Sequence, residues 1–107
     1  MIRDTISKIE ARLQGANACS DEVRAELLQL LGELKREISN VDEDQALSIA
    51  GHTEHVTAQA TGEPRNPELL KRSIQELSES VDGFEKSHPR LVEVVNRIAT
   101  TLSNIGI

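Results

Sequence analysis

Apolar residues recur every three or four positions along most of the chain, and the pattern is longest in the last third. There, one series alternates steps of four and three residues, with a single polar member, His88. The other members are Leu70, Ile74, Leu77, Val81, Phe84, Leu91, Val95, Ile98, Leu102 and Ile105. A mean period of 3.5 residues places them on one stripe of a helix, as in the seam of a coiled coil or bundle. Such a stripe must pack against helices of the same chain or of a second copy.

Shorter apolar series predict helices in the first half. Residues 2–13 supply about three helical turns, and a leucine-rich stripe over 23–38 marks the most apolar helix, which we expect at the centre of the fold. Ser20 is suited to cap that second helix. Asp42 resembles the start of a capping box, with Gln45 reaching back from the third helical position.

The segment 46–60 gives a weaker helical signal. Gly51 interrupts its apolar pattern, and Thr53 and Thr57 lower its helix propensity further. We still predict a helix here, with a mobile second half. Residues 61–66 then form the clearest linker in the chain.

After this linker, Asn66 is suited to cap a helix with Pro67 at its first position. No segment alternates apolar and polar residues with period two over a convincing length. We therefore predict an all-α protein, a bundle of four to five amphipathic helices with coiled-coil-like seams, in a single domain over residues 1–107.

Pro89 allows two shapes for the last third of the chain. One helix over 67–105 would be about 57 Å long and would need a second copy to cover its seam. A break near Pro89 would instead give a hairpin within one subunit. Proline disfavours the helical conformation at His88, and Gly83 can end the preceding helix, so we favour the break.

The final residues have the pattern of a helix stop. Gly106 lies where a left-handed residue commonly follows the last helical turn, and Ile107 would then pack back on Leu102. Two pairs of opposite charge, Glu68 with Arg72 and Glu93 with Arg97, have the spacing of ion pairs along one helix.

Composition narrows the classes of partner. Twelve basic against eighteen acidic residues give a net charge of −6, which argues against a nucleic acid or an anionic membrane as the main partner. Phe84 is the only aromatic residue besides histidine, so platforms for stacking bases are lacking. The single Cys19 fits a reducing cytosol, and no apolar run could span a bilayer or form a signal core, so we expect a cytoplasmic protein.

Three places could carry chemistry. His52 and His55 lie three residues apart, a spacing on one helical face that can chelate a divalent metal if Glu54, Asp44 or Glu63 supplies a third ligand. We prefer to interpret the two histidines as solvated surface residues.

His88, in phase with the seam, could act as a pH-responsive switch, although a helix-capping or loop role is the simpler interpretation. Cys19 precedes a helix N-terminus, where the pKa of a thiol can fall, yet we interpret it as a packing residue in a loop.

The C-terminal sequence resembles a known family. Ser87-His88-Pro89, followed by a helix and then by Leu-Ser-Asn-Ile-Gly-Ile over residues 102–107, is similar to the C-terminal signature of small bacterial proteins that are classified only as a domain of unknown function. The resemblance implies a short helical protein of the bacterial cytoplasm. It implies no activity, cofactor or catalytic residue.

These observations lead to two hypotheses of function. The first is a non-catalytic helical module that associates with other proteins, with a homodimer favoured because the apolar stripes exceed what a small bundle easily covers. Its interface would use the seam residues Leu70, Ile74, Leu77, Val81, Leu91, Val95, Ile98 and Leu102. The alternative is a protein that binds a metal or small ligand through His52, His55 and nearby carboxylates. We expect no enzymatic activity and no cofactor.

Overall fold

Five α-helices make up the computed structural model, which describes residues 2–16, 19–62 and 66–106. They are α1 (Ile2–Gly15), α2 (Asp21–Ile38), α3 (Glu43–Thr61), α4 (Pro67–Ser80) and α5 (Pro89–Gly106). These ranges contain no β-strand. The prediction of an all-α bundle is confirmed.

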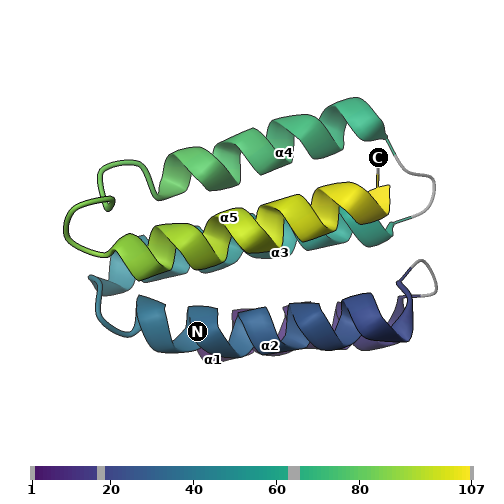
Figure 1. The fold of residues 1–107 in the computed structure, drawn as a ribbon, viewed down its shortest axis with the longest axis horizontal. Helices are drawn as coiled ribbons and strands as arrows, with labels where there is room; N and C mark the ends of the chain where they lie inside the picture. Colours follow the sequence, from purple (N-terminus) through teal and green to yellow (C-terminus); the bar gives the residue numbers. More distant parts are fainter. Residues whose placement is uncertain (1, 17–18, 63–65, 107) are drawn as a thin grey trace.

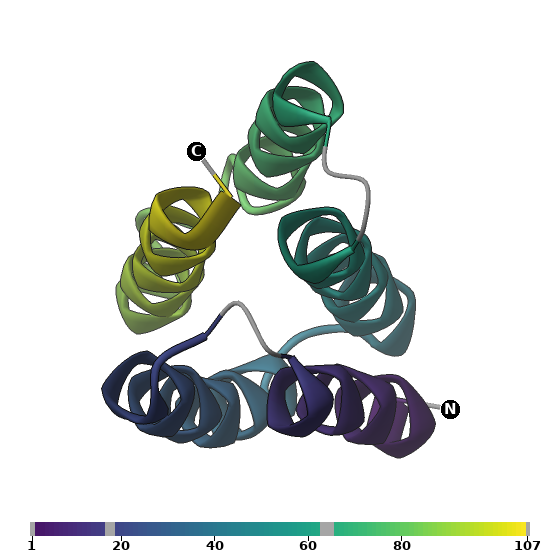
Figure 2. The same cartoon turned by 90° about the vertical axis from the view of Figure 1, so that its right-hand side faces the viewer.

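The helices run alternately in opposite directions (Figure 1). Seen end on, α1, α2, α5 and α3 form a closed ring in which each helix packs on its neighbours, and α4 lies outside the ring against α3 and α5 (Figure 2). The molecule measures 36 × 24 × 23 Å, with a radius of gyration of 12.7 Å. One core cluster draws side chains from all five helices.

Two of the three predicted caps form hydrogen bonds. Ser20 Oγ accepts from the backbone N–H of Val23 at 3.2 Å, and Asn66 Oδ1 accepts from the N–H groups of Glu68 and Leu69 at 3.1 and 3.2 Å. These bonds satisfy donors that a helix start leaves without an intrahelical partner. Asp42 occupies the cap position of α3, but its side chain makes no capping hydrogen bond, so the predicted capping box is wrong.

The apolar seam is divided into two helices at Pro89. α4 ends at Ser80, Gly83 adopts φ +95°, and α5 begins at Pro89. Glycine tolerates this left-handed conformation because it has no Cβ. The predicted break is confirmed, since the molecule is 36 Å long and α5 folds back beside α4 (Figure 1). Gly106 is the last residue of α5, and the predicted packing of Ile107 lies outside the described residues.

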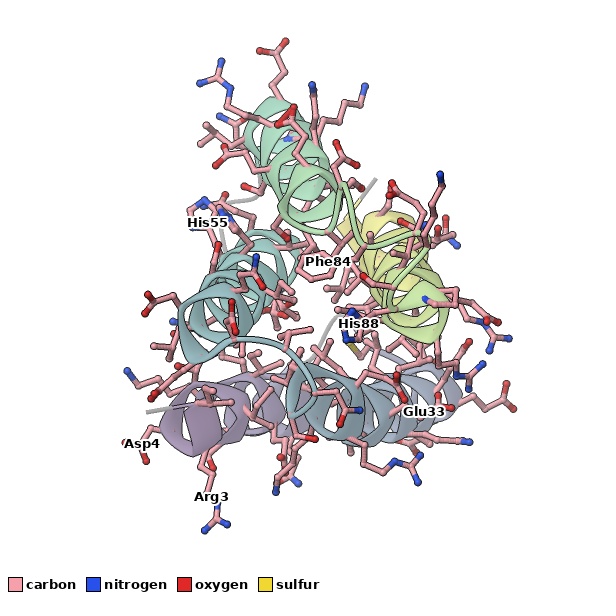
Figure 3. All side chains as sticks on the ribbon, turned by 90° about the vertical axis from the view of Figure 1, so that its left-hand side faces the viewer. Arg3, Asp4, Glu33, His55, Phe84 and His88 are labelled. Atoms are coloured by element: carbon pink, nitrogen blue, oxygen red, sulfur yellow. The ribbon has the colours of Figure 1, made fainter. Side chains whose placement is uncertain are left out.

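The α4–α5 connection covers one end of the bundle. Figure 3 shows Phe84 and His88 over this end, between the helices, with their rings 5.6 Å apart and edge to face. The backbone N–H of His88 donates to the carbonyl of Phe84 at 2.7 Å. At the other boundary, α3 ends at Thr61, the first residue of the predicted linker, and Asn66 caps α4, with residues 63–65 outside the described ranges.

The predicted central position of α2 is wrong. α2 packs mainly on α1 and α5, whereas α3 packs on α1, α4 and α5. α3 is continuous through Gly51 and buries one set of residues at helical spacing: Ala46, Ile49, Ala50, Thr53, Val56, Thr57 and Ala60. Because alanine and threonine are small, neighbouring helices can approach α3 closely. The hydrophobicity of these residues alone predicts less burial for α3 than the structure shows.

Candidate functional site

The predicted interface residues lie in the core of the single chain. Leu70, Leu77, Val81, Leu91, Val95, Ile98 and Leu102 are each at most 2% exposed, and Ile74 is half-buried against the same cluster. Among the described residues, Leu69 is the exposed large apolar residue, at 44%. The stripe that suggested a dimer is therefore covered by other helices of its own chain. Any association must use a different surface.

His52 and His55 lie on α3, His52 half-buried and His55 exposed, with His55 directed away from the bundle in Figure 3. Of the suggested third ligands, Glu54 is half-buried and Asp44 is exposed, while Glu63 lies outside the described residues. Within the described ranges, no group of three or more His, Cys, Asp or Glu side chains is arranged to hold a metal ion. Metal binding at His52 and His55 stays a prediction without an identified third ligand.

His88 and Cys19 have visible structural roles. His88 directly precedes α5; its carbonyl accepts from the N–H of Val92 at 3.3 Å, and its Nδ1 lies 3.0 Å from Ser87 Oγ. Cys19 is 7% exposed, and its carbonyl accepts from Arg24 Nη2 at 3.4 Å. These contacts agree with the simpler interpretations, a loop residue at a helix start and a packing residue between two helices.

A surface that the sequence did not indicate lies on the outer face of α5. An open groove of about 730 Å³ runs between α2 and α5, and a second of about 280 Å³ runs between α4 and α5. Three exposed residues of α5 line both grooves: Asn96, Thr100 and Asn104. We call these three residues the α5 ridge. Since they are spaced by four, they lie along one face of the helix for about 12 Å.

The walls of both grooves are partly apolar. Val23 of α2 and Ile105 of α5, both half-buried, line the larger groove. Ile74 of α4, also half-buried, and Ala99 of α5 line the smaller one. The larger groove is also lined by three charged residues: Glu26, Glu93 and Arg97. Uncharged residues such as those of the ridge are typical of the core of a protein interface, whereas charged residues are found at its rim.

Charge is concentrated in the first half of α5. Arg90 forms an ion pair with Glu33 of α2 and another with Glu93 at 3.2 Å. The hydrogen bond to Glu33 and the charges of both carboxylates raise the pKa of Arg90, which stays protonated. Arg97 is the last charged residue of α5, so residues 98–105 carry no charge.

The ion pairs predicted from spacing do not form. Glu93 binds Arg90 rather than Arg97, and no ion pair joins Glu68 to Arg72, all four of which are described residues. Because an exposed salt bridge gains little over hydration, spacing alone does not decide which pairs form, and Glu93 pairs with Arg90 although both residues are exposed. Arg97 thus lines the larger groove without a salt bridge to Glu93.

Sequence reasoning missed the α5 ridge because it followed the apolar residues of the same helix. The available signal was the polar side: asparagine and threonine at four-residue spacing in a stretch without charge. Most exposed positions of α4, by contrast, carry charged residues: Glu68, Lys71, Arg72, Glu76 and Glu79.

Residues 37–107 match the family described as a domain of unknown function, DUF4404, and the chain belongs to this family. The match covers the end of α2 and all of α3, α4 and α5, including the ridge. No curated protein and no solved structure matches the chain. None of the described helices is both long and apolar enough to cross a membrane.

Proposed function

We propose that this DUF4404 protein is a non-catalytic helical module that acts by association, and that its first partner is a second copy of the same chain. The observation that carries the proposal is the outer face of α5, where the uncharged ridge separates two partly apolar grooves. This face replaces the apolar seam as the interface, because the seam is buried within one chain.

Charge supports a second copy as the partner. Each chain carries a net charge of −6, so two copies repel unless they meet where like charges are absent. Residues 98–105 of α5 meet this condition at the centre of the face, and the charged Glu26, Glu93 and Arg97 line the larger groove beside it. Asparagine and threonine side chains both donate and accept hydrogen bonds, so such a surface is complementary to itself, as a two-fold interface requires.

The resemblance of the C-terminal signature and the single cysteine lead us to propose a bacterial, cytoplasmic location. The signature lies wholly within the segment that matches the family. In the fold, Ser87 and His88 directly precede α5, Pro89 is its first residue, and residues 102–106 form its last part. A role of the signature in presenting the outer face of α5 is part of the same proposal.

The test is the mass in solution, measured by light scattering on chromatographed protein across the micromolar range. We expect twice the 11.8 kDa of one chain. Thr100→Glu, at an exposed ridge position, places negative charges on both sides of the contact and is expected to give monomers. Ser7→Glu, at an exposed position of α1, adds the same charge elsewhere and is expected to leave the dimer intact.

A wild-type protein that stays monomeric at the highest concentration would contradict self-association. A dimer that persists in Thr100→Glu would retain self-association but exclude this face. Circular dichroism and a thermal melt of both variants show that a change in mass does not come from unfolding.

A further inference from the structure

We propose that two copies pair through α5 in antiparallel orientation, with the two-fold axis passing at Thr100. This inference rests on the proposed self-association and adds its geometry. It assigns a specific opposing residue to each member of the α5 ridge. Thr100 would face Thr100 of the second copy, and Asn96 would lie at the level of the other copy's Asn104.

The spacing of the ridge supports this centre. Asn96 and Asn104 are each four residues from Thr100, so reversing the helix about Thr100 exchanges one asparagine with the other. Each amide can then donate to and accept from its counterpart. Pairing centred on Thr100 overlaps residues 94–106 of both copies, a contact about 18 Å long. α5 spans Pro89–Gly106, so most of the helix takes part.

Charge decides between the antiparallel and the parallel arrangement. In a parallel pair, identical residues lie at the same level, so Arg97 would be level with Arg97 and Glu93 with Glu93. Both pairings place like charges at one level of the contact. In the antiparallel pair, Arg97 lies at the level of Ser103, which is uncharged. The helix dipoles also oppose one another only in the antiparallel arrangement, which is the favourable orientation.

The flanking grooves give the pair its apolar contacts. In the antiparallel pair the two-fold axis lies in the plane of the interface and is perpendicular to both α5 helices. It places the α2 side of one copy against the α2 side of the other, and the α4 side against the α4 side. Each large groove then meets its own equivalent, with Glu26, Glu93 and Arg97 among the residues that line it, and each small groove does the same. Val23 and Ile105 on one side and Ile74 on the other are the half-buried apolar groups that this contact would cover.

Disulfide trapping tests this geometry. With helix axes about 8–10 Å apart and Cα atoms about 2.3 Å from each axis, facing Cα atoms lie about 3.4–5.4 Å apart. This range overlaps the Cα–Cα distance of about 4.4–6.8 Å that a disulfide bridges. The background is Cys19→Ala, which removes the native cysteine. Thr100→Cys in this background is oxidised mildly, and dimers are counted on a non-reducing gel. Light scattering measures the mass of the same sample before oxidation.

We expect Thr100→Cys to form disulfide dimers at least about tenfold faster than Ser7→Cys, because a preformed contact raises the effective concentration of the thiols. Mixing mass-tagged Asn96→Cys with Asn104→Cys should give mainly mixed dimers. Each of these variants alone should crosslink slowly.

Three results would overturn the inference. Equal rates for Thr100→Cys and Ser7→Cys in a sample that scatters as a dimer place the interface elsewhere and leave self-association standing. Dimers formed by Asn96→Cys alone and by Asn104→Cys alone, without mixed dimers, indicate parallel helices. A monomeric mass before oxidation contradicts the proposed self-association itself, and with it this geometry.

Discussion

α3 and α4 are neighbours in the sequence and in space, yet the sequence predicts them with very different clarity. α4 has a regular apolar stripe, a proline at its first position and a capping asparagine, but it lies outside the four-helix ring. α3 lacks a capping hydrogen bond and contains a glycine and several threonines, but it packs on three other helices. The clearest helical signal therefore belongs to a peripheral helix.

The physical reason is the size of the buried side chains. α4 is held by Leu70, Ser73 and Leu77, with two large leucines. α3 buries more residues, mostly alanine and threonine, in the same helical spacing. Thr53 and Thr57 can be fully buried because their hydroxyls donate to the carbonyls of Ile49 and Thr53 at 2.8 Å. Small residues give a weak hydrophobic signal and still allow close helix packing.

The largest expected effect comes from emptying the core at α3. Ile49 is 0% exposed, so Ile49→Ala should lower the free energy of unfolding by about 2–5 kcal/mol through lost burial and the cavity left behind. Leu69→Ala, on the exposed side of α4, should change it by less than about 0.5 kcal/mol. Urea unfolding measures both. A large loss for Leu69→Ala would show that this side of α4 is covered in solution.

Overpacking tests whether the small residues of α3 are needed. Ala50 is 0% exposed, and Ala50→Leu adds three carbons to a filled site, so we expect a loss of about 1–3 kcal/mol. The matched change on α4 is Gln75→Leu at an exposed position, for which little change is expected. If Ala50→Leu were as stable as the wild type, the packing around Ala50 would have room for a larger side chain, contrary to its full burial.

The N-terminal caps of α4 and α3 also differ, because a side chain caps α4 but not α3. Asn66→Ala removes an oxygen that accepts from two backbone N–H groups, which should cost about 0.5–2 kcal/mol. Asp42→Ala removes no capping hydrogen bond and should cost less. Chemical denaturation of both variants gives the comparison. An equal cost at the two positions would mean that Asp42 does cap α3 in solution.

The smallest expected effect is a gain in stability. Gly51 lies within α3, is exposed, and a Cβ added there meets no atom within 4 Å. Gly51→Ala should therefore raise the stability by about 0.4–1 kcal/mol, by restricting the unfolded chain. Gly62→Ala is the control and should lower the stability, because its Cβ would lie 2.8 Å from the carbonyl oxygen of Ala58. Thermal melts would refute the first expectation if Gly51→Ala melted below the wild type.

The sequence predicted much of the local structure and little of the candidate site. The cap at Asn66, the stop near Gly83 and the restart at Pro89 depend on neighbouring residues, and each was correct. The α5 ridge could not be predicted in the same way. Its grooves exist only because α2 and α4 flank α5, and Val23 and Ile74 come from segments far from it in sequence.

By itself, the sequence determined the helical class, the positions of the breaks and the face of most helices that is buried, because these follow from local chemistry and a 3.5-residue period. Only the tertiary structure decided that most of the seam from Leu70 to Leu102 is covered within one chain and that α3 takes the central place. An apolar stripe indicates that its residues must be buried, but it does not indicate which helix buries them. That choice depends on how five helices fill space together, and it left the polar face of α5 exposed.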